Sequence, residues 1–228
     1  MRHGRLLVGA AAMVALGWPL WAAAAWLRYG RGHRRRDPRL DELLPSYDVE
    51  DARAARIAAP PSVTCAVVMA TGLDRSMLVR LIVGARERLL GARGGRPWPS
   101  GGVVEQLRGW GWGVLAEEPL RAVVLGAVTQ PWRPDVQFRA LAPDAFAAFD
   151  EPGFVKILVA IVVEPAGLQA ASILRVVTRV ATTDRAARAR FRRYWATFSP
   201  GIVLIRRATL HAIRRDAERR WASALGRG

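Results

Sequence analysis

The chain has 228 residues, of which 51% are hydrophobic, and it carries a formal net charge of +16. This hydrophobic content excludes a largely disordered chain, and the length suits one globular domain with an appendage. The single cysteine, Cys65, excludes an intramolecular disulfide and a zinc site built on cysteines. Because Cys65 lies in an apolar stretch, we expect it to be a buried packing thiol.

The excess positive charge is confined to the two ends of the chain. Residues 1–36 contain seven arginines and no acidic residue, and residues 183–228 contain twelve arginines against three acidic residues. Residues 37–182 contain equal numbers of basic and acidic residues. A nucleic-acid-binding domain usually spreads basic charge over its binding face, and the predicted strands lack a basic and aromatic platform. We therefore expect no nucleic-acid partner.

Residues 6–27 form an uncharged stretch that is long enough for a transmembrane helix. At a rise of 1.5 Å per residue these 22 residues span about 33 Å, and the hydrocarbon core of a bilayer is about 30 Å thick. Five arginines follow within residues 28–36, whereas only Arg2 and Arg5 precede the stretch. Under the positive-inside rule, residues 1–27 are predicted to be a single-pass membrane anchor with the following domain in the cytoplasm.

The same segment also has the features of a secretory signal peptide. Arg2 and Arg5 supply a basic n-region, residues 6–16 an apolar h-region, and Ala22 and Ala24 a candidate cleavage site. Cleavage there would place the arginine cluster directly after the cut, so the cluster would have to cross the membrane first. Export after cleavage is therefore the alternative to a retained anchor.

Residues 28–48 are predicted to be an Arg-rich polar tether, and residues 49–228 the folded domain. Within the tether, Pro38 and Pro45 bracket the apolar residues 40–44, which can dock on the domain.

The domain is predicted to begin with a weak strand at residues 49–58, which two prolines end. Two short helices are expected next, at residues 63–70 and 77–90. Ser62 is the candidate N-cap of the first helix, and Asp74 or Ser76 that of the second. The Gly/Pro-rich loop 91–102 contains no phosphate-binding motif.

Five segments rich in valine, isoleucine and aromatic residues then predict strands. They are residues 112–117, 121–129, 135–141, 154–164 and 171–182. The short connections between most of them require antiparallel neighbours, and residues 142–149 form a candidate helical turn. Residues 183–224 have the apolar periodicity of a helix, in which Ser199-Pro200-Gly201 predicts a kink or a break.

This order of elements resembles the SRPBCC superfamily, the START-like, polyketide cyclase/dehydrase-related helix-grip proteins. The segments that carry the resemblance are AAPPSVTCAVVMA, GVLAEEP, FDEPGFVKI and TRVATTDRAARARFRRYW. The resemblance covers about residues 48–222. It implies an α+β fold in which a curved antiparallel sheet of about six strands wraps a long C-terminal helix around a hydrophobic cavity. The N-terminal anchor and the long loop 91–102 depart from the family pattern.

The candidate ligand-binding residues are aromatic residues and two arginines on the predicted strands and the last helix. They are Trp112, Trp132, Phe138, Phe154, Arg175, Arg179, Tyr194 and Phe198. Arg175 and Arg179 share one face of a strand, because they lie four residues apart. If that face is concave, the two guanidinium groups can bind an anionic headgroup or a carboxylate. Otherwise they face solvent, with Val176, Thr178 and Val180 inward, and core packing is the alternative role of the aromatic residues.

The sequence contains no set of residues that predicts a metal site, a cofactor or a catalytic nucleophile. The three histidines lie far apart, and there is no G-x-S-x-G motif. The first functional hypothesis is a membrane-tethered domain that binds a lipid or another apolar small molecule. The second is a structural or interaction protein whose Arg-rich helix lies on an anionic leaflet. The third, implied by the resemblance, is a cyclase/dehydratase-type enzyme.

Overall fold

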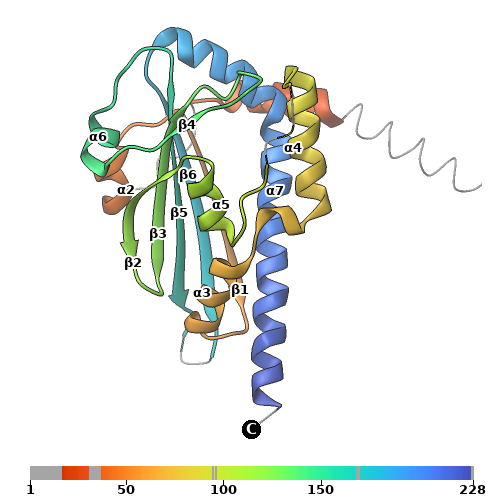
Figure 1. The fold of residues 1–228 in the computed structure, drawn as a ribbon. Helices are drawn as coiled ribbons and strands as arrows, with labels where there is room; N and C mark the ends of the chain where they lie inside the picture. Colours follow the sequence, from red (N-terminus) through yellow and green to blue (C-terminus); the bar gives the residue numbers. More distant parts are fainter. Residues whose placement is uncertain (1–16, 31–36, 94, 96, 168–169, 227–228) are drawn as a thin grey trace, which may run out of the picture.

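A six-stranded antiparallel sheet and a long C-terminal helix form the α+β fold of the chain (Figure 1). The computed structural model describes residues 17–30, 37–93, 95, 97–167 and 170–226. The strands are β1 (Val49–Ile57), β2 (Gly113–Glu118), β3 (Ala122–Thr129), β4 (Phe138–Arg139), β5 (Val155–Pro165) and β6 (Ser172–Thr182). Their order is β1-β6-β5-β3-β2, with β4 paired to β3. This arrangement fits the helix-grip architecture that we expected from the order of elements.

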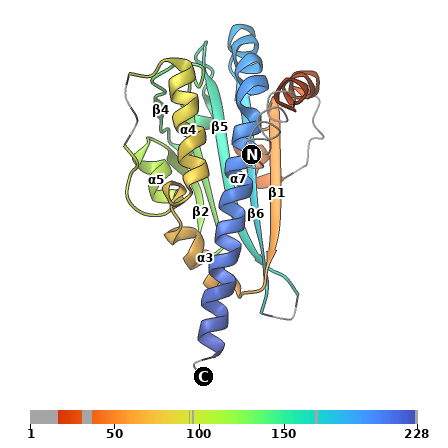
Figure 2. The same ribbon diagram turned by 90° about the vertical axis from the view of Figure 1, so that its right-hand side faces the viewer.

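The helices lie on both sides of this sheet (Figures 1 and 2). They are α2 (Pro38–Leu43), α3 (Pro61–Ala70), the 3₁₀ turn η1 (Leu73–Arg75), α4 (Met77–Leu90), α5 (Val103–Gly109), α6 (Pro143–Ala148) and α7 (Arg185–Leu225). Residues 17–28 are also helical, and we call them the N-terminal helix. Helices α3, α4, α5 and α7 lie on one side of the sheet, and α2 and α6 on the other. We call these the α7 side and the α2 side.

The two helices expected after the first strand are confirmed as α3 and α4. Ser76 caps α4, because its side chain accepts a hydrogen bond from the backbone N–H of Val79. Ser62 does not cap α3, which begins one residue earlier, at Pro61. A proline at the first helical position has the φ angle of a helix already and lacks an N–H that would need a partner.

Helix α7 runs without a break through Pro200, and its axis changes direction in its first part (Figure 1). Of the two outcomes expected at Ser199-Pro200-Gly201, a kink or a break, the break is wrong. Ser199, Pro200 and Gly201 are buried at the place where other helices cross α7. The indole N–H of Trp21 donates to Ser199 Oγ at 3.3 Å. A Cβ on Gly201 would lie 2.8 Å from Ile82 of α4, so the missing side chain allows the close approach. These contacts stabilise the helix where proline removes a hydrogen bond.

Two other elements differ from the expectations. The strand expected at residues 135–141 is reduced to the two residues of β4, because the preceding segment 131–137 forms turns and extended loop. Helix α5 was not expected, because it lies after a Gly-rich segment and its N-cap, Gly102, offers no side chain for capping.

The N-terminal helix packs against the first turns of α7. Arg192 of α7 donates to the carbonyl oxygen of Trp26 at 2.9 Å, and its guanidinium lies 3.9 Å from the centre of the Trp26 ring. Among the residues that the structure describes, no helix is both long enough and apolar enough to cross a bilayer. Residues 1–16 of the predicted membrane anchor lie outside the described residues.

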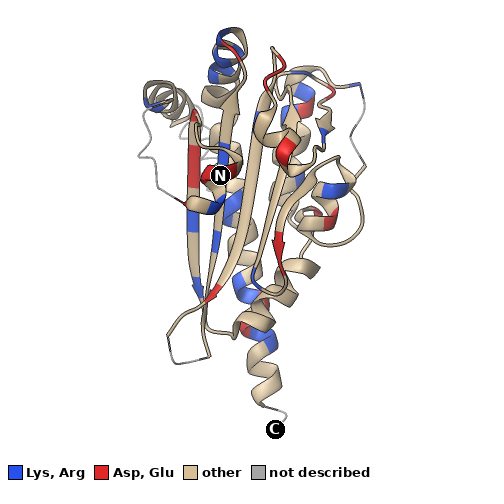
Figure 3. Cartoon of the chain, turned by 90° about the vertical axis from the view of Figure 1, so that its left-hand side faces the viewer, with Lys and Arg blue, Asp and Glu red and all other residues tan. Residues whose placement is uncertain are grey.

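The arginines near the C-terminus lie along α7, and the central strands carry few charges (Figure 3). Of the arginines of α7, only Arg192 and Arg206 are half-buried, and the others are exposed.

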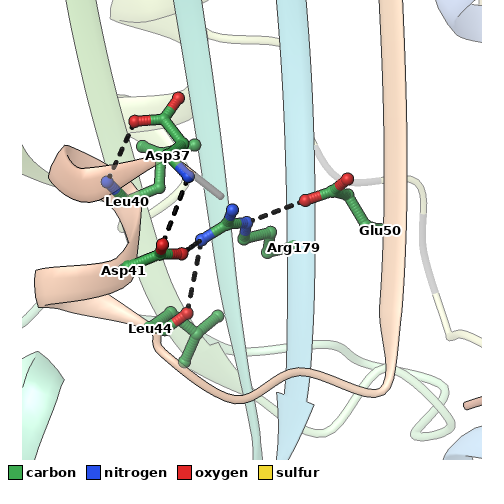
Figure 4. A network of polar contacts seen from close by, with 6 residues as sticks. All are labelled: Asp37, Leu40, Asp41, Leu44, Glu50 and Arg179. Atoms are coloured by element: carbon green, nitrogen blue, oxygen red, sulfur yellow. Dashed lines mark hydrogen bonds and ion pairs between the residues drawn. The ribbon is translucent and has the colours of Figure 1, made fainter. Parts of the chain in front are cut away.

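On the α2 side, the buried residue Arg179 connects three segments of the chain (Figure 4). Its Nη1 donates to Asp41 of α2 at 2.6 Å and its Nε to Glu50 of β1 at 2.9 Å. Burial opposes the charge of Arg179, but these two hydrogen bonds outweigh it and raise the pKa of the guanidinium above its ordinary value. Leu40 and Leu44 are buried beside it, so the docking expected for residues 40–44 is confirmed.

We predict that Arg179→Met destabilises the fold by about 3–5 kcal/mol, because it leaves the buried carboxylate of Glu50 without its partner. The free energy of unfolding is measured by urea titration. The matched control is Arg175→Met on the same face of β6, where the ion pair with Glu164 is about 39% exposed on each side and we expect at most about 1 kcal/mol. Equal effects of the two substitutions would contradict the structural role of Arg179.

Candidate functional site

A cavity of about 510 Å³ lies between the sheet and helices α4, α5 and α7. Its floor is formed by residues of β5 and β6, namely Ile157, Val159, Thr178 and Val180. Residues of α4 and α7 cover it, namely Val79, Val83, Phe191, Tyr194, Trp195, Ile202 and Ile205. The lining is mostly apolar, and the volume lies in the range of about 300–1,000 Å³ that small-molecule sites occupy.

Both faces of strand β5 are apolar, and its side chains alternate between the two sides of the sheet. Ile157 and Val159 face the cavity, whereas Leu158 and Ala160 point to the opposite face and pack with residues of α2 and α6. Since helices cover the sheet on both sides, β5 reads in the sequence as a continuous apolar run.

Aromatic residues form the wall of the cavity near β2. Trp98 and Trp110 lie with their ring centres 5.0 Å apart, and Trp112 and Phe138 with theirs 5.3 Å apart. Gly111 lies between Trp110 and Trp112 in the chain and has a φ angle of +95°, a conformation that strongly favours glycine. Its missing side chain leaves room for the backbone of Phe138.

A second, smaller cavity of about 130 Å³ continues beneath α7. Thr178 of β6 and Arg206 of α7 line both cavities, so these two residues lie at the junction.

Four residues around this junction form what we call the polar corner: Asp51, Arg53, Thr178 and Arg206. Asp51 lies directly opposite Thr178 in the pairing of β1 with β6. Its carboxylate accepts hydrogen bonds from Arg206 and from Nε of Arg53, the latter at 3.0 Å. Burial lowers the pKa of Arg206 below its ordinary value, and the attraction of Asp51 opposes this shift.

Two buried polar atoms at the larger cavity have no hydrogen-bond partner in the described part of the chain. They are Oγ1 of Thr178, which belongs to the polar corner, and Nε1 of Trp112, which belongs to the aromatic wall. A buried polar group without a partner is unfavourable. Two residues of the lining therefore carry buried hydrogen-bonding groups that the described part of the chain leaves unused.

Arg86 of α4, which lines the cavity, joins three elements around it. Its Nη2 donates to the carbonyl oxygen of Pro131 at 2.7 Å, and its Nε donates to the hydroxyl of Tyr194 at 3.2 Å. It therefore connects α4 to the loop 131–137 and to α7. The carboxylates of Glu87 and Asp135 also line the cavity.

The structure brings only some of the predicted ligand-binding residues together. Trp112, Phe138 and Tyr194 line the cavity. Phe198 packs against Tyr194 outside the lining, Trp132 packs in the neighbouring core, and Phe154 packs against Phe149.

The expectation that Arg175 and Arg179 enter the cavity is wrong, because both lie on the α2 side of β6. Val176, Thr178 and Val180 face α7, as the alternative proposed. Arg175 is partly exposed, as the alternative also proposed, but Arg179 is buried rather than solvent-facing.

Sequence reasoning missed four residues of the site. They are Arg206, Asp51, Trp98 of the loop 91–102 and Trp110. Arg206 follows Ile202 by four residues, so its position on the apolar stripe of α7 was a usable signal. Asp51 gave no such signal, because its role depends on its ion pair with α7.

Comparison of the chain with models of protein families, with curated proteins and with solved structures gives no match. The geometry of the cavity therefore carries the functional argument.

We predict that Arg86→Gln loosens the contact of α4 with the loop 131–137, whose residues also line the cavity. Hydrogen bonds from a charged group contribute about 1.5–3 kcal/mol, so their loss should raise amide hydrogen exchange in residues 131–137 roughly tenfold or more. Exchange is measured by mass spectrometry, with Arg88→Gln on the exposed face of α4 as the control. Unchanged exchange in Arg86→Gln would show that other contacts hold the loop 131–137 in place.

Proposed function

We propose that this protein is a membrane-tethered domain that binds a lipid or another apolar small molecule between its sheet and α7. The observation that carries the proposal is the largely apolar cavity of about 510 Å³. Protein interiors are otherwise close-packed, and water in an apolar space finds few hydrogen-bonding partners. An apolar ligand fills such a space with more favourable contacts.

The membrane part of the proposal rests on the uncharged residues 6–27. Trp21 and Trp26 of this stretch contact α7, so its C-terminal part lies next to that helix. A bilayer-inserted anchor would hold α7 and the cavity close to the membrane surface, with the domain on the cytoplasmic side. The exposed arginines of α7 are suited to an anionic leaflet. Helix α4, which covers the cavity, exposes Met77, Leu78, Leu81 and Leu89.

Membership in the SRPBCC superfamily is part of the same proposal. The order of strands and helices, with a cavity between the sheet and the terminal helix, supports it. Asp51, which lies beside the junction of the two cavities, is already bound to two arginines, and the carboxylates that line the cavity are those of Glu87 and Asp135. Binding is favoured over catalysis because the rest of the lining is mostly apolar.

The test places a large side chain in the cavity. A matching substitution on the opposite face of the sheet serves as the control. Val159 lines both cavities, so Val159→Trp should place the larger side chain in the ligand space. Native mass spectrometry of the full chain, with solvent extraction of what is bound, should find an apolar molecule in the wild type and at least about fivefold less in this variant.

The matched control is Val162→Trp, on the same strand but on the α2 side, which should retain the bound molecule. Cooperative unfolding of both variants shows that they fold. A wild-type chain that carries no apolar molecule and takes up none when it is offered would contradict the proposal.

A further inference from the structure

We propose that the ligand is a single-chain amphiphile with an anionic head, and that this head binds Thr178 and Arg206 at the polar corner. This specifies the class of ligand and rests on the apolar-ligand function proposed above.

Thr178 supplies the first argument, because it is a buried hydrogen-bonding group without a partner. Its side chain is on the cavity side of β6, the residue is only 5% exposed, and Oγ1 has no partner in the described part of the chain. An oxygen atom of a bound head can accept a hydrogen bond from this hydroxyl. The free energy lost by its burial would then be recovered.

The charges around the junction supply the second argument. Arg53 and Arg206 share the single carboxylate of Asp51, so these three residues carry one net positive charge. In the described part of the chain, Arg206 donates a hydrogen bond only to Asp51, although a guanidinium has five N–H groups. A partly buried positive charge with unused donors favours a bound anion.

The other charged residues of the lining do not compete for this role. Arg86 is already bound to backbone carbonyls and to Tyr194, and Glu87 and Asp135 would repel an anion. The anionic head is therefore expected at the polar corner.

The shape of the larger cavity indicates where the apolar part of the ligand lies. The larger cavity extends from Thr178 on β6 past Ile157 and Val159 of β5 to Trp112, which precedes β2, and β3 lies between β5 and β2 in the sheet. Three strand spacings of about 4.8 Å correspond to about 14 Å. Apolar side chains line this path, so it suits an extended alkyl chain of medium length.

The experiment compares probes that share one alkyl chain and differ in the head. The full-length chain in phosphatidylcholine nanodiscs is equilibrated with dodecanoate, dodecyl phosphate, dodecanol or dodecyltrimethylammonium, and uptake by empty nanodiscs is subtracted. We expect the two anions to bind at least tenfold more tightly than the alcohol and the cation. The stronger of the two anions distinguishes a carboxylate head from a phosphate head, and either supports the inference.

Three substitutions at the polar corner have different expected effects on dodecanoate binding. Arg206→Met should weaken it about tenfold or more, and Thr178→Val, which keeps the shape of the side chain, about three- to tenfold. Asp51→Asn should strengthen it, because it removes the competing carboxylate. The matched control is Arg207→Met, at an exposed position on the same helix, which should leave binding unchanged.

Binding of dodecanol equal to that of the anions, together with an unaffected Arg206→Met variant, would overturn the anionic head and leave the apolar-ligand function intact. If none of the four probes binds, both the head and the proposed function are wrong. Stronger dodecanoate binding by Asp51→Asn cannot result from loss of folding, so it supports the inference even if Arg206→Met is unstable.

Discussion

Helices cover both faces of the sheet, and the rest of the structure depends on this constraint. Strands β5 and β6 lie in the middle of the sheet, so each must place apolar residues on both sides. The two sides are then used differently. On the α2 side, the apolar residues pack tightly with Leu40, Leu44 and Phe146, whereas on the α7 side the long helix covers the sheet without filling the space beneath it.

Two arginines illustrate how position decides what the same charged group does. Arg179 is buried between α2 and β1, where Asp41 and Glu50 compensate its charge, and its role is to join segments of the chain. Among the described residues, Arg206 pairs with one carboxylate, that of Asp51, which it shares with Arg53, and it borders open space. The first is therefore a structural ion network, and the second leaves a positive charge available to a ligand.

Much of the fold could be predicted from the sequence, because its elements carry strong local patterns. The alternation and turn residues located every end of β2, β3, β5 and β6 to within one residue, and Ser76 marked the start of α4. Local patterns failed at α5 and β4, where tertiary contacts decide the outcome. The candidate site was predicted less well, because a pattern of alternation gives two faces but does not say which one is turned towards α7.

The sequence by itself determined the class of fold, the apolar strands, the long terminal helix and the concentration of arginines in it. These properties follow from composition and periodicity, which act over neighbouring residues. Only the tertiary structure decided that Thr178 rather than Arg179 faces the cavity, and that Asp51 meets Arg206, 155 residues away in the chain. The physical reason is that such a site depends on which faces of distant elements pack together, and no local interaction encodes that choice.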